Sequence, residues 1–165
     1  MKTSDYFTIL IAALALCAAI WNDHATRKHN RLSVKPHINI GKYILPDWSG
    51  IYLWNIGLGP AMVKSFRVII HGEVIPGKSM EIWNAAIKTL GFGEVLGSAT
   101  ATGFQAGDTI PNGGKIHLIE VNAANISPNE YKIKQDSVLK FLKDIKIEIE
   151  YTSMYENEKF NCIWP

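Results

Sequence analysis

The sequence predicts a mainly β fold, a β-sandwich of short antiparallel strands preceded by one N-terminal membrane helix. Three patterns lead to this prediction. Apolar and charged residues alternate along residues 145–151, as in a strand with one buried and one solvated face. Short apolar runs recur through the rest of the chain, separated by turn sequences such as "GLGP" and "PNGG". Residues 6–21, "YFTILIAALALCAAIW", carry no charge.

The strand at residues 145–151 is the best supported element, because its isoleucines alternate with lysine and glutamate. Residues 160–164 repeat the alternation after the turn "YENE", which predicts a C-terminal hairpin. Parallel strands covered on both faces are continuously apolar, so this pattern favours antiparallel sheets. Further strands are expected at residues 34–40, 50–56, 62–71, 94–104 and 115–122.

Two short helical insertions are expected among these strands. Ser79 can cap a helix whose apolar residues from Ile82 to Leu90 follow a 3.6-residue period, and Gly91 is placed to end it. A second, shorter helix is expected at about residues 135–142, where three apolar residues share a face. Each helix should pack one face on the sheets.

Composition bounds the class of protein. With 165 residues, the chain has room for one domain with a core and an appendage. Its hydrophobic share of 47% and charged share of 19% are typical of a globular protein with an apolar addition, not of a disordered chain. The formal net charge of +2 is small, and the basic residues cluster after the apolar stretch. We therefore expect no nucleic-acid partner.

The apolar stretch is interpreted as an uncleaved membrane anchor. Tyr6 and Trp21 bound it, as aromatic residues do at membrane interfaces. A cleaved signal peptide is the alternative, but Ile20 and Trp21 are too bulky for a small-x-small cleavage site. The predicted organisation is an anchor at residues 1–22, a basic neck at 23–33 and a β-sandwich domain at 34–165.

The basic neck predicts the orientation. Arg27, Lys28 and Arg31 follow the apolar stretch, while little positive charge precedes it. Because positive flanks stay in the cytoplasm, we expect an inner-membrane protein whose C-terminal domain faces the cytosol. The neck can also contact anionic lipid. Small side chains at Ala12, Ala15 and Ala19 share one helix face, so a second copy of the chain is a candidate partner in the bilayer.

Two patches of sequence carry a resemblance. The run "NIGLGPA" at residues 55–61, between two apolar strands, resembles the strand-turn-strand of bacterial immunoglobulin-like modules of the adhesion-domain type. The run "HNRLSVKP" after the membrane helix is similar to a group of small, single-pass, largely uncharacterised bacterial membrane proteins. The resemblance implies an immunoglobulin-like sandwich on a membrane tether and brings no catalytic residues. Its exposed turn is a candidate partner-binding site, formed by Gly57, Leu58, Gly59 and Pro60.

The stretch "GEVIPGKS" at residues 72–79 fits the pattern of a phosphate-binding loop. In that interpretation Gly72, Gly77, Lys78 and Ser79 hold a nucleotide, and Glu120 holds its magnesium ion. Too little chain follows for a doubly wound nucleotide-binding sheet, and Pro76 removes a backbone donor that the phosphates need. We therefore expect a tight turn at residues 71–73, with "VIP" continuing along the sheet edge.

No other pattern predicts chemistry. The histidines lack a metal-ligand spacing, Cys162 sits on an alternating strand as a core side chain, and the tryptophans at 48, 54, 83 and 164 are expected mostly in the core. We expect no catalytic residue, metal or cofactor. The leading hypothesis is a non-catalytic, membrane-anchored module that binds a protein partner or assembles in the membrane. The alternatives are a nucleotide-binding protein and an envelope adhesin or surface-machine subunit facing outside the cytoplasm.

The predicted orientation is tested with reporter fusions. We expect green fluorescent protein after Pro165 to fluoresce and alkaline phosphatase at the same position to be inactive, because the neck holds the domain in the cytosol. A matched fusion of each reporter to a protein of known outside C-terminus is the control. Active phosphatase after Pro165 would contradict the prediction and favour the envelope-facing alternative.

Overall fold

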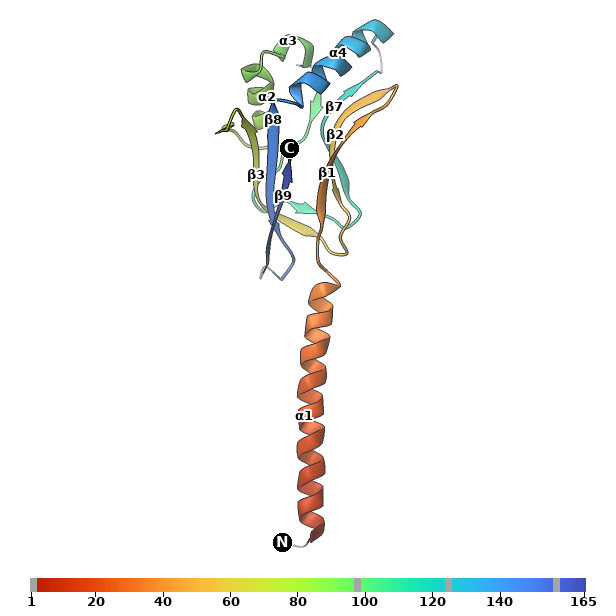
Figure 1. The fold of residues 1–165 in the computed structure, drawn as a ribbon, viewed down its shortest axis with the longest axis vertical. Coiled ribbons are helices and arrows are strands. Elements are labelled where there is room, and N and C mark those ends of the chain that lie inside the picture. Colours follow the sequence, from red (N-terminus) through yellow and green to blue (C-terminus); the bar gives the residue numbers. More distant parts are fainter. Residues whose placement is uncertain (1–2, 97–98, 124–125, 156–157) are drawn as a thin grey trace. The chain divides into compact units, whose positions relative to one another are not determined.

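The computed structural model describes residues 3–96, 99–123, 126–155 and 158–165, and the chain divides into two compact units, Met1–Val34 and Lys35–Pro165. The first unit contains one continuous helix, α1 (Thr3–Leu32), which covers the predicted anchor from Thr3 and the predicted neck up to Leu32 (Figure 1). Its Tyr6–Asn30 part is long and apolar enough to cross a membrane, by length and composition. Arg27 pairs with Asp23 one turn earlier, at 2.9 Å, in the polar end of the helix.

The second unit contains two sheets whose recorded strand pairs are all antiparallel. Sheet A has the order β1-β2-β7-β5, and sheet B has the order β4-β3-β8-β9, with β6 also pairing with β3. Sheet A comprises β1 (Ile38–Ile44), β2 (Trp48–Asn55), β7 (Lys115–Asn122) and β5 (Thr100–Ala101). Sheet B comprises β3 (Ala61–Ile70), β4 (Glu73–Val74), β6 (Thr109–Ile110), β8 (Ile145–Thr152) and β9 (Lys159–Trp164).

One hydrophobic core joins the two sheets. Ile51 and Leu53 of sheet A and Val68 and Ile147 of sheet B are fully buried in the same cluster. Three helices lie together at one end of the sheets (Figure 1): α2 (Met80–Thr89), α3 (Gly93–Leu96) and α4 (Pro128–Phe141). They add large side chains to the core, among them Trp83, Leu96 and Phe141.

Most predicted elements are confirmed, with shifted ends. The strand at 115–122 is confirmed at both ends, and residues 145–152 and 159–164 form the expected C-terminal hairpin. The first strand begins four residues later than predicted, at Ile38, because residues 35–37 bond to the turn that follows β2. The turn "YENE" of the C-terminal hairpin includes residues 156–157, which lie outside the described part.

The strand predicted at residues 94–104 is wrong. Its first residues belong to the short helix α3, and its described residues contribute the two-residue strand β5. Among the described residues of the second unit there are therefore three helices, where two helical insertions were predicted. The last of them, α4, begins at Pro128, because the Ser127 hydroxyl accepts a hydrogen bond from the Glu130 N–H at 3.2 Å and caps it there.

The helix after "GEVIPGKS" is confirmed, but Ser79 does not cap it through its side chain. The Ser79 hydroxyl donates to the Gly103 carbonyl oxygen at 3.3 Å instead. Glycine at position 103 allows this close approach, since a Cβ there would lie 2.2 Å from the Ser79 backbone carbonyl oxygen. Ser79 thus connects the start of α2 to the chain beyond β5, and Gly91, with φ 75°, follows the end of the helix as expected.

A buried amide, Asn55, joins three segments at the other end of sheet A. Its Oδ1 accepts from the N–H groups of His37 at 3.1 Å and Gly57 at 3.0 Å. Its Nδ2 donates to the carbonyl oxygens of Gly59 at 2.9 Å and of Ile110 at 3.2 Å. The side chain is 0% exposed, so these bonds replace water completely. We call this set of contacts the Asn55 junction.

Glycine makes the junction possible. A Cβ on Gly57 would lie 2.2 Å from the His37 nitrogen and 2.6 Å from the Lys35 carbonyl oxygen. The "NIGLGPA" turn can therefore pack directly on the backbone that enters β1, and Leu58 N–H donates to the Lys35 carbonyl oxygen at 3.0 Å. Any larger residue at position 57 would push these backbones apart.

We predict that Asn55→Ala lowers the free energy of unfolding by about 3 kcal/mol, because it leaves several buried backbone groups without partners. Urea unfolding of the full chain in detergent, followed by tryptophan fluorescence, measures this. Asn39→Ala, at an exposed position of β1, is the matched control and should change stability by less than about 0.5 kcal/mol. Equal losses in the two variants would contradict a special role for the junction.

Candidate binding surface

The outer face of sheet A is rich in aromatic side chains. Its residues alternate with the core-facing Ser49, Ile51, Leu53 and Asn55 of β2, which are buried. Trp48 and Trp54 are 43% and 42% exposed, far more than core tryptophans. We call this surface the aromatic face; it is formed by Tyr43, Trp48, Tyr52, Trp54, Lys115, His117 and Glu120.

Two glycines flatten this face. Gly41 pairs with Tyr52 across β1 and β2, and a Cβ on Gly41 would lie 2.9 Å from the Tyr52 ring. The ring therefore lies across the glycine. A Cβ on Gly50 would lie 2.0 Å from the Ile119 carbonyl oxygen, so Gly50 lets β7 approach β2 beside the register shift between Ile51 and Tyr52.

The rings contact one another and hold polar groups between them. The Tyr43 ring lies 5.8 Å from Tyr52 and 5.4 Å from His117, and Trp48 meets His117 edge-on at 5.7 Å. On the far side of Tyr52, the Lys115 ammonium lies 4.0 Å from the ring centroid, a cation–π contact. These contacts restrict the side chains and give the face a fixed shape.

A polar trio lies at the centre of the aromatic face. The Tyr43 hydroxyl donates to Glu120 Oε2 at 3.2 Å and lies 3.4 Å from His117 Nδ1. His117 Nδ1 also contacts Glu120 Oε2. Burial raises the pKa of the Tyr43 phenol well above its usual range, and the neighbouring Glu120 carboxylate raises this pKa further. The phenol therefore stays protonated and keeps donating to the carboxylate.

Sheet B presents a different outer face. Glu148 pairs with Lys146 at 2.8 Å and with Arg67 on the next strand at 3.3 Å. Lys159 pairs with Glu150 at 3.1 Å in the same sheet. Lys146 and, to a smaller degree, Arg67 lower the pKa of the Glu148 carboxyl. This face is an ordinary solvated surface of matched charges, whereas the aromatic face resembles the centre of a protein interface in composition.

The predicted partner-binding turn is only partly available. Leu58 is 71% exposed, whereas Gly59 is buried and its carbonyl oxygen accepts a hydrogen bond from Asn55 Nδ2 in the Asn55 junction. Gly57 is packed on residues 35–37, and Pro60 is half-buried. Leu58 alone projects from the turn, which connects β2 of sheet A to β3 of sheet B.

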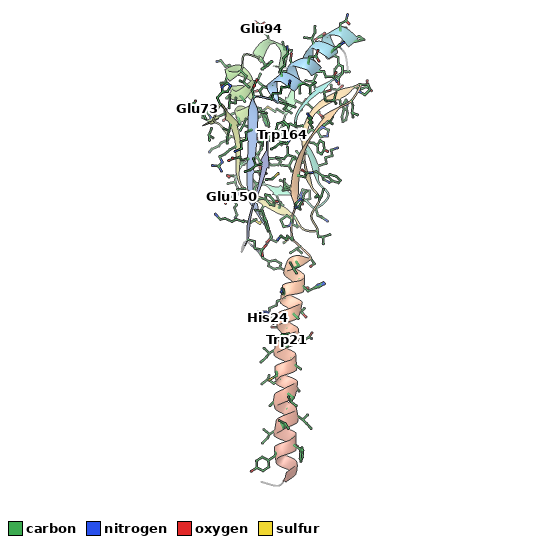
Figure 2. The ribbon with its side chains drawn as sticks, viewed as in Figure 1. Trp21, His24, Glu73, Glu94, Glu150 and Trp164 are labelled. Atoms are coloured by element: carbon green, nitrogen blue, oxygen red, sulfur yellow. The ribbon has the colours of Figure 1, made fainter. Side chains whose placement is uncertain are left out.

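The residues of the phosphate-loop interpretation are engaged in other contacts. His71 and Gly72, with φ 52° and 88°, form a tight turn, after which β4 pairs with β3 and Ile75 N–H donates to the Val68 carbonyl oxygen. The segment thus continues along the sheet edge, as expected, with the Glu73 side chain in Figure 2 near this edge. The Lys78 N–H donates to the Glu81 carboxylate at 3.3 Å, so the chain's own anion meets the start of α2.

The other nominated groups lie elsewhere. Ser79 bonds to Gly103, and Glu120 belongs to sheet A, where Tyr43 and His117 bind its carboxylate. Gly77 and Lys78 instead border a small pocket of about 320 Å³ with Phe66 and Phe104. Among the described residues, no group of three His, Cys, Asp or Glu side chains is placed to hold a metal ion.

The predicted membrane-interface residues all lie on α1. Tyr6 and Trp21 are 62% and 78% exposed, and Figure 2 shows Trp21 and His24 projecting from the helix. Arg27, Lys28 and Arg31 follow within the same helix. Their spacing along α1 puts aromatic residues at both ends of the apolar segment and the basic residues beyond its second end.

Comparisons with known proteins add little. No protein-family model matches the sequence, and no curated protein matches it. One solved structure, described as "Crystal structure of protein from Archaeoglobus fulgidus", is similar over 79% of this chain and 91% of that one, with 8% identical residues and a TM-score of 0.23. A likeness at that score carries no argument about fold or function.

We predict that magnesium-ATP and magnesium-GTP do not stabilise the chain. A ligand at 100 times its dissociation constant would add about 2.7 kcal/mol, which is easily visible as a rise in Tm. The measurement is thermal unfolding of the full chain in detergent, with and without nucleotide, for the wild type and Lys78→Ala. A clear rise in Tm that Lys78→Ala abolishes would overturn this prediction and establish the nucleotide interpretation.

Proposed function

We propose that this chain is a membrane-anchored, non-catalytic module whose aromatic face binds a partner protein. The contrast between the two outer faces supports the proposal: sheet B is covered by matched ion pairs, while sheet A exposes Trp48 and Trp54 around a fixed polar trio. Tryptophan and tyrosine are enriched in binding hot spots, which lie at the centre of an interface with a polar rim around them. A face held in one shape by its own contacts loses little conformational freedom on binding.

For the domain we propose an immunoglobulin-like β-sandwich. In that topology strands A, B, E and D form one sheet, and strands C, F and G form the other. The order β1-β2-β7-β5 corresponds to A-B-E-D, and β3-β8-β9 corresponds to C-F-G. The short β4 then occupies the place of strand C′ beside β3. Helices α2 and α3 are insertions between C′ and D, and α4 is an insertion between E and F.

We also propose that the anchor holds this domain on the cytosolic side of the inner membrane. The basic residues Arg27 and Lys28 after the apolar part of α1 support this orientation. A partner would then be a cytosolic protein or another protein of the same membrane. An envelope-facing adhesin is the alternative if the domain lies on the other side.

The proposed surface is tested by photocrosslinking in intact cells. We expect a photoreactive phenylalanine at Trp48 or at Trp54 to give the same protein adduct, because both positions border one partner footprint. Arg67 is the matched control position, since its side chain is 48% exposed on the outer face of sheet B. Tyr52→Ala should remove the adduct at Trp54 by taking away the neighbouring ring on the same face of β2.

The mass of the adduct separates the outcomes. An adduct of this chain with a different protein supports the proposal, and an adduct of two copies of the chain identifies a self-assembly surface instead. Equal labelling at Trp54 and Arg67, or labelling that Tyr52→Ala leaves unchanged at normal protein stability, would contradict the proposal.

A further inference from the structure

The two sheets meet along a seam between β1 and β9, which lie side by side without forming a ladder. Side chains close the first part of this seam. Ile38 N–H donates to the Tyr151 hydroxyl of β8 at 3.1 Å. The backbone of Ile40 interacts with the Cys162 thiol of β9, and burial raises the pKa of that thiol. The seam is therefore sealed at Ile38 and Ile40 by groups of sheet B.

Beyond Ile40 the seam opens into a pocket of about 500 Å³, within the size range of sites for small ligands. We call it the seam pocket. Its walls come from β1, from the end of α4 and from β9 with the residue after it. Most of its lining is apolar, and Trp164, labelled in Figure 2, stands on the core-facing side of β9 opposite Ile147. The lining residues are Lys42, Ile44, Leu139, Leu142, Lys143, Trp164 and Pro165.

Two lysines line the seam pocket. Lys42 follows Ile38 and Ile40 at the core-facing positions of β1, where an apolar residue would continue the core. Lys143 follows the end of α4. In the part of the chain that the structure describes, neither lysine takes part in an ion pair, in contrast to Lys146 and Lys159 on the outer face of sheet B. Two unpaired ammonium groups beside an apolar pocket favour an anion with an apolar body.

The backbone of β1 adds donors at the same place. Tyr43 pairs with Gly50, and Leu45 N–H donates to the Trp48 carbonyl oxygen, so the odd-numbered residues of β1 bond to β2. In an antiparallel strand the intervening residues direct their N–H groups to the other side. The N–H groups of Lys42 and Ile44 therefore point to the free edge of β1, along which the seam pocket opens.

We propose that the seam pocket binds a single-chain amphiphile with an anionic head group, a carboxylate or a phosphate. The head group lies between the Lys42 and Lys143 ammonium groups, and the acyl chain packs on Ile44, Leu139 and Trp164. A peptide adding a strand to β1 fits less well, because the edge is already closed at Ile38 and Ile40 and only a short run of free backbone remains. The site is separate from the aromatic face and does not depend on the function proposed for it.

The test uses the full chain in a neutral maltoside detergent and a dodecanoate that carries a photoreactive diazirine. We expect the label on residues of the seam pocket, mapped by mass spectrometry, and competition by dodecanoate or dodecyl phosphate but not by dodecanol. The double variant Lys42→Gln, Lys143→Gln should reduce labelling about tenfold, because it removes both charges that hold the head group. Lys140→Gln, on the exposed side of α4, is the matched control and should label as the wild type does.

A second variant keeps the test independent of the lysines. Ile44 is 49% exposed, so Ile44→Glu places a negative charge at the pocket mouth without removing a core side chain. We expect it to abolish labelling at the pocket while the urea midpoint of the domain stays at the wild-type value. Label confined to α1, equal competition by dodecanol, or unchanged labelling in both variants would overturn the proposal.

Discussion

The domain depends on one buried amide. The side chain of Asn55 is fully withdrawn from water, yet it bonds to the entry of β1, to the turn after β2 and to the end of β6. An isolated polar group in such a place would cost several kcal/mol, whereas one with all its partners fixes their positions. The junction sets where β1 begins and hence which of its residues face the core. The alternation that produces the aromatic face follows from this register.

The outer faces of the two sheets carry different kinds of side chain. In sheet A, glycines at 41 and 50 remove side chains from the outer face, and the neighbouring rings spread over the space. In sheet B, lysine, arginine and glutamate fill the equivalent positions and neutralise one another across strands. Exposed aromatic surface lowers solubility, and exposed apolar patches often mark interaction sites, so this contrast makes the aromatic face the candidate binding surface.

The sequence predicts the strands well where one face is clearly polar, as in β8, and where apolar runs end at turn residues, as in β7. It misleads at residues 94–104, where a short helix and a two-residue strand share an apolar segment that periodicity alone does not divide. The start of α4 was predictable. Ser127 and Glu130 have the spacing of a capping box, but the first turn is polar, and the prediction followed the apolar residues further on.

The candidate surface was harder to find from the sequence. Along "WSGIYLWN" both alternating sets are largely apolar, so period two alone does not tell which set faces the core. The packing of sheet B decides which set is buried, because it covers Ile51 and Leu53 and leaves Trp48 and Trp54 exposed. The prediction that the tryptophans mostly fill the core is correct for Trp83 and wrong for these two. Nor could the polar trio be predicted, because His117 and Glu120 meet Tyr43 only after β1 and β7 flank β2.

The sealed part of the seam protects the edge of β1 from neighbouring copies of the chain. Unpaired N–H groups on an edge strand are a template on which another chain can add a strand, and this leads to domain swapping or aggregation. Confinement by a membrane anchor would bring edges of neighbouring copies together often. The Tyr151 hydroxyl, which receives the Ile38 N–H, and the Cys162 thiol beside Ile40 block this template from within the same domain. Domains crowded at the bilayer surface would therefore not add strands to one another along this part of β1.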